Sequence, residues 1–253
     1  MLWFIVLLVI LAVVYLTCIV PTKWLKIERI DMPLGLGLTV LQLSDLHVER
    51  CRVRPSKLRS MIRQEKPDII CLTGDFLDKA SSFVLLVPYL KMLQGTGIST
   101  YAVLGNHDYF LKKPHELRAL LQSYGITVLE NEAITLDGFH LVGIDDFCSG
   151  HHDEEALRRV SRDKPVVVMT HDPTLILDMK ESFDYLFAGH LHGKQFAIPF
   201  LFKLKDMGPL AAAGIYKGLH RCEKGPFYIS KGLGQSGVNL RFLVRSELTI
   251  HYL

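Results

Sequence analysis

Five short apolar runs, each followed at once by a polar motif, restrict the fold of this 253-residue chain more than any other feature. The motifs are SDLH, TGD, GNHD, THD and GHLH, and they follow the apolar runs at 38–43, 68–72, 99–104, 166–170 and 185–188. Apolar runs of this length bounded by turn residues predict buried strands. Segments with helical spacing, such as 55–66, alternate with them. The alternation predicts one α/β domain in which two sheets are plausible.

The polar motifs are expected to meet in space, because loops at the carboxyl ends of strands in α/β sheets converge on one crevice. Taken alone, the H-x-H pair in GHLH would suit an ordinary polar loop better than a metal site. Together, the five motifs supply carboxylate, amide and imidazole donors: Asp45, His47, Asp75, Asn106, His171, His190 and His192. This mixture suits Mn²⁺, Fe or Zn²⁺ rather than Ca²⁺ or a copper–thiolate site.

The number of donors predicts two metal ions rather than one. Seven side chains exceed what a single ion needs once a position is left open for water. Two divalent ions about 3.5–4 Å apart, bridged by a carboxylate, would use them all. Mn²⁺ is the expected metal, with Fe or Zn²⁺ as alternatives. A pair of this kind suits in-line displacement at phosphorus.

In their order along the chain, the motifs resemble those of the calcineurin-like metallophosphoesterase superfamily. The resemblance extends from residue 38 to the end of the chain, and it implies a two-sheet sandwich flanked by helices. GIDD (143–146), the Gln after GHLHG, and YISKGLGQSG near the C-terminus resemble a membrane-associated bacterial phosphodiesterase branch. That branch includes enzymes that cleave UDP-2,3-diacylglucosamine in lipid A biosynthesis.

The resemblance also implies a role for each motif residue. Asp45, His47 and His192 would bind one metal, Asn106, His171 and His190 the other, and Asp75 would bridge both. Metal-bound hydroxide would hydrolyse a phosphodiester or pyrophosphate bond. His107 would protonate or stabilise the leaving oxygen, and Asp108 would orient His107.

Three basic residues are candidates for substrate contacts. The branch usually reads GHTHGGQ where this chain has GHLHGKQ, so Lys194 stands in place of a glycine. Its ammonium could meet a substrate phosphate or could simply be solvated. Lys231 and Arg241, in the tail YISKGLGQSGVNLRF, could form part of a phosphate rim, or the glycine-rich piece could be a turn beside the sheet.

Residues 2–20 form an apolar run without charge, Gly or Pro. As a helix the run would span about 28 Å, close to the hydrocarbon thickness of a bilayer. It lacks a basic segment before it and a clear small-x-small cleavage site, so a retained anchor is expected rather than a signal peptide. Lys23, Lys26 and Arg29 follow it. Basic residues tend to stay cytoplasmic, which predicts a single-pass inner-membrane protein with a cytoplasmic catalytic domain.

The expected organisation is a transmembrane anchor at 1–21, a linker at 22–37 and a metallophosphoesterase domain at 38–253. The net charge of +3 at pH 7 suits the face of an anionic membrane better than a nucleic-acid groove. No nucleic-acid partner is expected, and the chain is expected to be a monomer. The cysteines are scattered, without a C-x-x-C pair, unlike a disulfide framework or a zinc knuckle.

The expected substrate is an amphiphile such as UDP-2,3-diacylglucosamine. Its acyl chains could lie along the apolar run at 198–204 with Trp24 and Leu25, although core packing would explain the same residues. The alternatives are a phosphodiesterase of an unrelated small or nucleotide substrate, and a non-catalytic scaffold with the same fold.

Other histidines are expected to be ordinary. His151 and His152 precede a helix start at Asp153, and His115, His140, His220 and His251 show no partner pattern.

Overall fold

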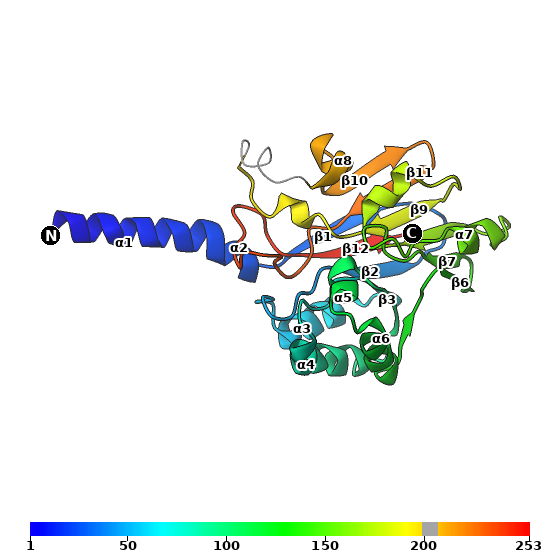
Figure 1. The fold of residues 1–253 in the computed structure, drawn as a ribbon, viewed down its shortest axis with the longest axis horizontal. Helices are drawn as coiled ribbons and strands as arrows, with labels where there is room; N and C mark the ends of the chain where they lie inside the picture. The colour runs from blue at the N-terminus through cyan, green and yellow to red at the C-terminus, as the bar shows by residue number, and fades with distance from the viewer. Residues whose placement is uncertain (199–206) are drawn as a thin grey trace.

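The computed structural model describes residues 1–198 and 207–253 and contains two six-stranded sheets packed face to face (Figure 1). The first sheet has the order β1-β12-β2-β3-β4-β5, and the second has the order β10-β11-β9-β8-β7-β6. The first contains β1 (Lys26–Asp31), β2 (Thr39–Leu43), β3 (Ile69–Thr73), β4 (Ser99–Val103), β5 (Ile126–Val128) and β12 (Glu247–Tyr252). The second contains β6 (Glu132–Thr135), β7 (His140–Gly143), β8 (Val166–Met169), β9 (Tyr185–Ala188), β10 (Gly218–Cys222) and β11 (Gly225–Ile229).

Helices cover the outer faces of the sandwich. The first sheet is covered by α3 (Pro55–Glu65), α4 (Phe83–Gln94) and α6 (Pro114–Ser123). The shorter helices are α5 (Asn106–Phe110), α7 (Glu155–Arg159) and α8 (Gly208–Ala212), and the 3₁₀ turns are η2 (Ala80–Ser82), η3 (Pro173–Leu177) and η4 (His192–Lys194). The predicted two-sheet α/β sandwich is therefore confirmed.

Three apolar layers hold the sandwich together, and the central strands contribute to two of them. In β3, Ile70 packs toward the helices while its neighbour Cys71 packs between the sheets, because successive side chains of a strand point to opposite faces. Every residue of β3 is buried. Strands buried on both faces read as continuous apolar runs, which is why the runs before the polar motifs coincide with β2, β3, β4, β8 and β9.

The segment 22–37, expected to be a linker, is partly a strand. β1 pairs in parallel with β12, with Lys26 opposite Glu247 and Asp31 opposite Tyr252. This strand lies at the edge of its sheet and alternates partly buried with exposed residues. Edge strands carry charged residues that discourage pairing with other chains. Its sequence, KIERID, therefore lacks the apolar run that marks the central strands.

The N-terminal helical segment projects away from the sandwich (Figure 1). It comprises α1 (Leu2–Val14), the π turn η1 (Tyr15–Ile19) and α2 (Val20–Lys23). Its 22 residues have a peak mean hydropathy of 3.0 and are unburied over that window. The segment is long and apolar enough to cross a membrane by length and composition. A signal sequence would have the same properties.

Candidate metal centre

The loops that follow β2, β3, β4, β8 and β9 meet at one edge of the sandwich and bring metal-ligating atoms together. One group contains Asp45, His47, Asp75 and His192, and a second contains Asp75, His171 and His190, with the ligand atoms of each group within 4.8 Å of one another. Asp75 belongs to both groups. Asn106 joins the second group, since its Oδ1 lies 3.1 Å from His190 Nδ1. All the side chains expected to bind metal are thus gathered around two centres.

In both groups, nitrogen atoms face other nitrogens and carboxylates at close range. The Nε2 atoms of His47 and His192 are 3.2 Å apart, and His171 Nε2 lies 3.2 Å from His190 Nδ1. Asp75 Oδ2 lies 3.4 Å from His47 Nε2 and 3.2 Å from His171 Nε2. Lone pairs converging in this way are what a cation bound between them requires. The donor set, imidazole with carboxylate and amide oxygens, fits two divalent ions.

The opposite ring nitrogens are held by other partners. His171 Nδ1 donates to the carbonyl of Thr73 at 2.7 Å, and His47 Nδ1 lies 2.9 Å from Asp78 Oδ1. Such a bond on one nitrogen fixes the tautomer and leaves the other nitrogen free as a ligand. The arrangement therefore turns Nε2 of both rings toward the other donor atoms of their groups.

The backbone at the ligands is strained. Positive φ angles occur at Asp45 (51°), His47 (37°), Asp75 (56°), His190 (70°) and His192 (48°). Non-glycine residues adopt this left-handed region at a free-energy penalty, and such residues cluster at functional sites. Two motif glycines are needed for close approach: a Cβ on Gly105 would clash with the Asp75 carboxylate, and one on Gly189 would clash with Ser44. The motifs thus encode backbone geometry as well as ligands.

Electrostatics keep the shared carboxylate ionised. Burial would raise the pKa of Asp75, but His171 and His47 hold it well below its usual range. Burial likewise opposes the charged form of His47, yet Asp75 and Asp78 raise its pKa to about 10. Metal ligands must be deprotonated, so an incoming ion has to displace a proton from His47.

His107 is held by a residue that the sequence reasoning missed. Its Nδ1 lies 2.7 Å from Asp78 Oδ1, and 29% of its side chain is exposed. Burial opposes ionisation of Asp78, but hydrogen bonds from His107 and His47 hold its pKa far below the usual value. Arg50 also contacts Asp78. The motif TGDFLD could have revealed Asp78, because it places a second carboxylate three residues after Asp75 in the same loop.

Asp108 does not orient the His107 side chain, contrary to expectation. Its carboxylate is buried and accepts hydrogen bonds from the backbone N–H groups of Asp75, Phe76 and Gly105, each at 2.9 Å. Both residues lie on α5, where consecutive side chains diverge by about 100° because a turn contains 3.6 residues. Asp108 therefore ties the loops after β3 and β4 together.

Two of the three candidate substrate contacts have structural roles instead. Arg241 is buried, and its guanidinium donates to the carbonyls of Lys231 (2.8 Å) and Gly232 (3.1 Å). Lys231 forms ion pairs with Glu28 (2.7 Å) and Glu247. Buried charges persist only when paired or hydrogen-bonded, so these cations are committed to the fold rather than to a substrate rim. Lys194 is partly exposed, with Nζ 4.5 Å from the centre of the Tyr216 ring.

Cys148 was not expected near the site. It lies at the surface, with Sγ within 4.8 Å of ligand atoms of Asp172 and His190. Burial, together with Asp146 and Asp172, raises the pKa of this thiol. Cys148 belongs to neither of the two groups that share Asp75.

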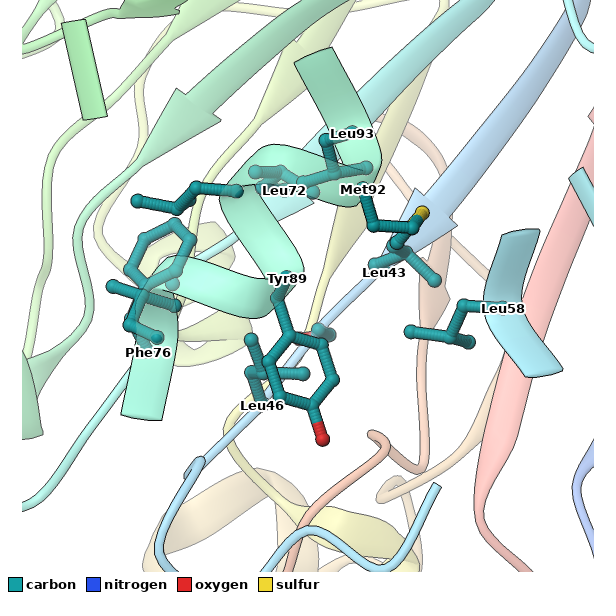
Figure 2. Close-up of a pocket in the computed structure, with 12 residues that line it drawn as sticks. Leu43, Leu46, Leu58, Leu72, Phe76, Tyr89, Met92 and Leu93 are labelled. Carbon is teal, nitrogen blue, oxygen red and sulfur yellow. The ribbon is translucent and has the colours of Figure 1, made fainter. Parts of the chain in front are cut away.

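The apolar region expected to admit acyl chains is only partly described. Residues 199–204 lie outside the described part of the chain, while Trp24 is exposed and Leu25 packs against the core. An apolar cavity beneath the metal loops is lined by Leu43, Leu58 and Tyr89, among others (Figure 2). Its volume is about 20 Å³, room for roughly one water. An acyl chain would need a different surface.

Comparison with known proteins agrees with this geometry. A family model for calcineurin-like phosphoesterases matches residues 38–194. The chain is 39% identical to the uncharacterized metallophosphoesterase YkoQ of Bacillus subtilis, covering 92% of this chain and 90% of that protein. It is 27% identical to a transmembrane protein with metallophosphoesterase domain of Danio rerio, covering 89% of this chain and 55% of that protein.

A solved structure supports the fold. The crystal structure of a dimetal phosphatase from Danio rerio matches with a TM-score of 0.50 at 13% identity, covering 79% of this chain and 89% of that one. At this identity the likeness bears on architecture alone. Sequence and site geometry carry the rest: the chain belongs to the calcineurin-like phosphoesterase family and is a metal-dependent hydrolase of phosphoester bonds.

Proposed function

We propose that this hydrolase cleaves a phosphodiester or pyrophosphate bond in an amphiphilic substrate at a membrane surface. The observation that carries the reaction is the pair of donor groups sharing Asp75. The membrane part is supported by the apolar helical segment Leu2–Lys23. With the complete ligand set and His107 gathered at one edge, the non-catalytic scaffold is not favoured.

The residues of the two donor groups have different proposed roles. Asp45, His47 and His192 would hold one ion, Asn106, His171 and His190 the other, and Asp75 would contact both. Two divalent ions, with Mn²⁺ proposed, supply Lewis acidity toward the phosphoryl oxygens and lower the pKa of a bound water. The loops that carry these residues would position the phosphoryl group at the site.

His107 is proposed as the general acid. Its Nδ1 is taken by Asp78, which leaves Nε2 to donate a proton to the departing oxygen. Its partial exposure allows contact with a substrate. Asp78 positions the imidazole.

The proposed location is the inner membrane, with the domain on the cytoplasmic side. The cations Lys23, Lys26 and Arg29 follow the apolar helix and tend to remain cytoplasmic. UDP-2,3-diacylglucosamine has the required chemistry, a pyrophosphate between a nucleotide and an acylated sugar. A soluble nucleotide or small phosphodiester is the alternative substrate.

The test compares the diacylated nucleotide sugar with its deacylated counterpart, using the full chain in lipid nanodiscs with Mn²⁺. Each methylene buried on binding contributes about 0.8 kcal/mol, so loss of the acyl chains should lower kcat/KM by orders of magnitude. Bis(p-nitrophenyl) phosphate serves as the soluble control for the metal chemistry. Equal rates on both nucleotide sugars would favour the alternative substrate class.

A further inference from the structure

The N-terminal helix is bonded to a segment more than two hundred residues away in the sequence. In an α-helix the carbonyl of Thr17 would accept from residue 21, but Pro21 has no N–H. The backbone N–H of Leu243 takes that place at 3.1 Å, and the N–H of Arg241 donates to the carbonyl of Cys18 at 3.1 Å. Figure 1 shows this C-terminal segment, in red, beside the base of the helix. The segment is therefore fixed to the helix end.

This attachment sets the depth of the segment. A bilayer core of about 30 Å requires about 20 apolar helical residues. The apolar run begins at Leu2, so Thr17 would lie within the last turn inside the hydrocarbon edge. Leu243, hydrogen-bonded to Thr17, would lie at the same depth.

The side chains around this attachment suit a lipid–water boundary. Leu243 is 60% exposed and Trp24 is 61% exposed. The Arg245 guanidinium stacks 3.9 Å from the centre of the Trp24 ring. Leu243 also has φ +57°, an unfavourable conformation for a leucine. Aromatic and basic side chains at the end of an apolar helix are typical of membrane interfaces.

The same segment reaches the metal centre. The Arg241 side chain donates to backbone carbonyls of the loop 231–234, whose Gly234 N–H bonds to the carbonyl of Asp45 at 2.7 Å. Next to Arg241, Phe242 exchanges backbone hydrogen bonds with Gln195 and Ala197, just after His192. Metal ligands and the exposed Leu243 are thus parts of one bonded unit.

We propose that Trp24, Leu243 and Arg245 form a membrane-contact surface that seats the domain on an anionic phospholipid bilayer in one orientation, with the metal centre held close to the lipid headgroups. The inference rests on the proposed anchoring role of the N-terminal helix and adds a second contact with the bilayer. The hydrogen bonds from Arg241 and Leu243 set the orientation, so the metal centre does not depend on a flexible tether to find its substrate.

The experiment places a fluorescent reporter at Leu243. The chain's two tryptophans, Trp3 and Trp24, are replaced by Phe, and either Leu243→Trp or Leu177→Trp is added. Leu177, 58% exposed on η3, is the matched control. Full-length chains are reconstituted into vesicles of equal parts phosphatidylglycerol and phosphatidylcholine, with and without bromine on the acyl chains near the headgroup.

Bromine should quench the tryptophan at 243 strongly and leave that at 177 unaffected. Equal quenching of the two, or quenching of neither, in chains that float with the vesicles would overturn the surface while leaving the anchor in place. Chains that do not float with the vesicles would overturn the anchor and this inference with it.

A second measurement tests the consequence for catalysis. Leu243→Asp should lower hydrolysis of a bilayer-embedded nucleotide lipid about tenfold or more, because a carboxylate is strongly disfavoured at the hydrocarbon edge. Hydrolysis of soluble bis(p-nitrophenyl) phosphate should be unchanged. An equal loss on both substrates, or a loss on neither, would contradict the proposed contact.

Discussion

The buried histidines of the metal centre and the buried His251 between the sheets have opposite surroundings. In the metal centre, His47 Nε2 faces His192 Nε2 at 3.2 Å and a carboxylate oxygen of Asp75 at 3.4 Å. Between the sheets, His251 has a neutral partner for each ring nitrogen, Tyr185 Oη at 2.8 Å and Gln42 Oε1 at 3.1 Å. His47 and His251 are both fully buried. Burial of a histidine therefore does not mark a site, whereas ring nitrogens converging on each other and on carboxylates do.

The pKa values of these two imidazoles are shifted in opposite directions. Burial lowers the pKa of His251 to about 3, so the ring is neutral. At His47 burial acts in the same sense, but Asp75 and Asp78 overcome it and raise the pKa to about 10. Asp75, which helps to attract a proton to His47, is also the carboxylate shared by the two donor groups.

Removing the shared carboxylate should have the largest effect. Asp75→Asn takes away the charge common to both donor groups, so both ions should be lost. With the metals contributing several kcal/mol to transition-state stabilisation, kcat/KM should fall about 10⁴-fold or more. Metal content by mass spectrometry and hydrolysis of bis(p-nitrophenyl) phosphate are the measurements. The control His251→Gln should keep both ions, and an Asp75→Asn protein with a full metal complement would break the contrast.

Replacing His107 should separate catalysis from metal binding. His107→Ala removes the proposed general acid, which contributes about 10²–10⁴-fold to the rate. The metal content should be unchanged, because His107 Nδ1 is paired with Asp78 and His107 belongs to neither of the two donor groups that share Asp75. Loss of metal together with activity would show that His107 is a ligand.

Asp78→Asn should have an intermediate effect on both metal binding and catalysis. Asp78 holds His47, a proposed metal ligand, and His107, the proposed acid. Replacing a residue that orients a ligand lowers metal affinity or activity by about 10–100-fold. Titration of the metal-free protein with Mn²⁺ and the pH profile of kcat are the readouts. If wild-type affinity and an unchanged profile were found, Asp78 would have no positioning role.

The smallest predicted effect is on the free energy of unfolding, and it depends on His251 being neutral in the folded protein. Because the folded-state pKa of His251 lies near 3, below its usual value of 6.5, the unfolded chain binds a proton first as the pH falls. Stability is therefore present above pH 6.5 and is lost as the pH drops toward 3. Between pH 7 and pH 5 the loss from this residue should be about 2 kcal/mol.

The measurement is urea unfolding at both pH values. His251→Gln cannot take up a proton, so its stability should vary less with pH than that of the wild type. The same pH dependence in the two proteins would mean that His251 is charged in the folded state or exposed to solvent.

By itself the sequence determined the central strands and the candidate ligands that follow them. A strand buried on both faces must be apolar along its length. The polar side chains of a motif at its end must have binding partners or face solvent. The position of each motif along the chain is therefore visible without tertiary structure. The candidate ligands are visible for the same reason, because imidazole and carboxylate donors are concentrated at the strand ends.

Only the tertiary structure decided how the remaining charged groups are used. Asp78 rather than Asp108 holds His107, because adjacent helical side chains diverge while a loop can fold back. Lys231 and Arg241 were candidates for a phosphate rim, yet Lys231 pairs with Glu28, 203 residues away, and Arg241 is buried against carbonyls of the loop 231–234. The edge strand β1 likewise needed β12 to be recognised. Such roles depend on contacts between segments far apart in the chain, and spacing within one motif carries no information about them.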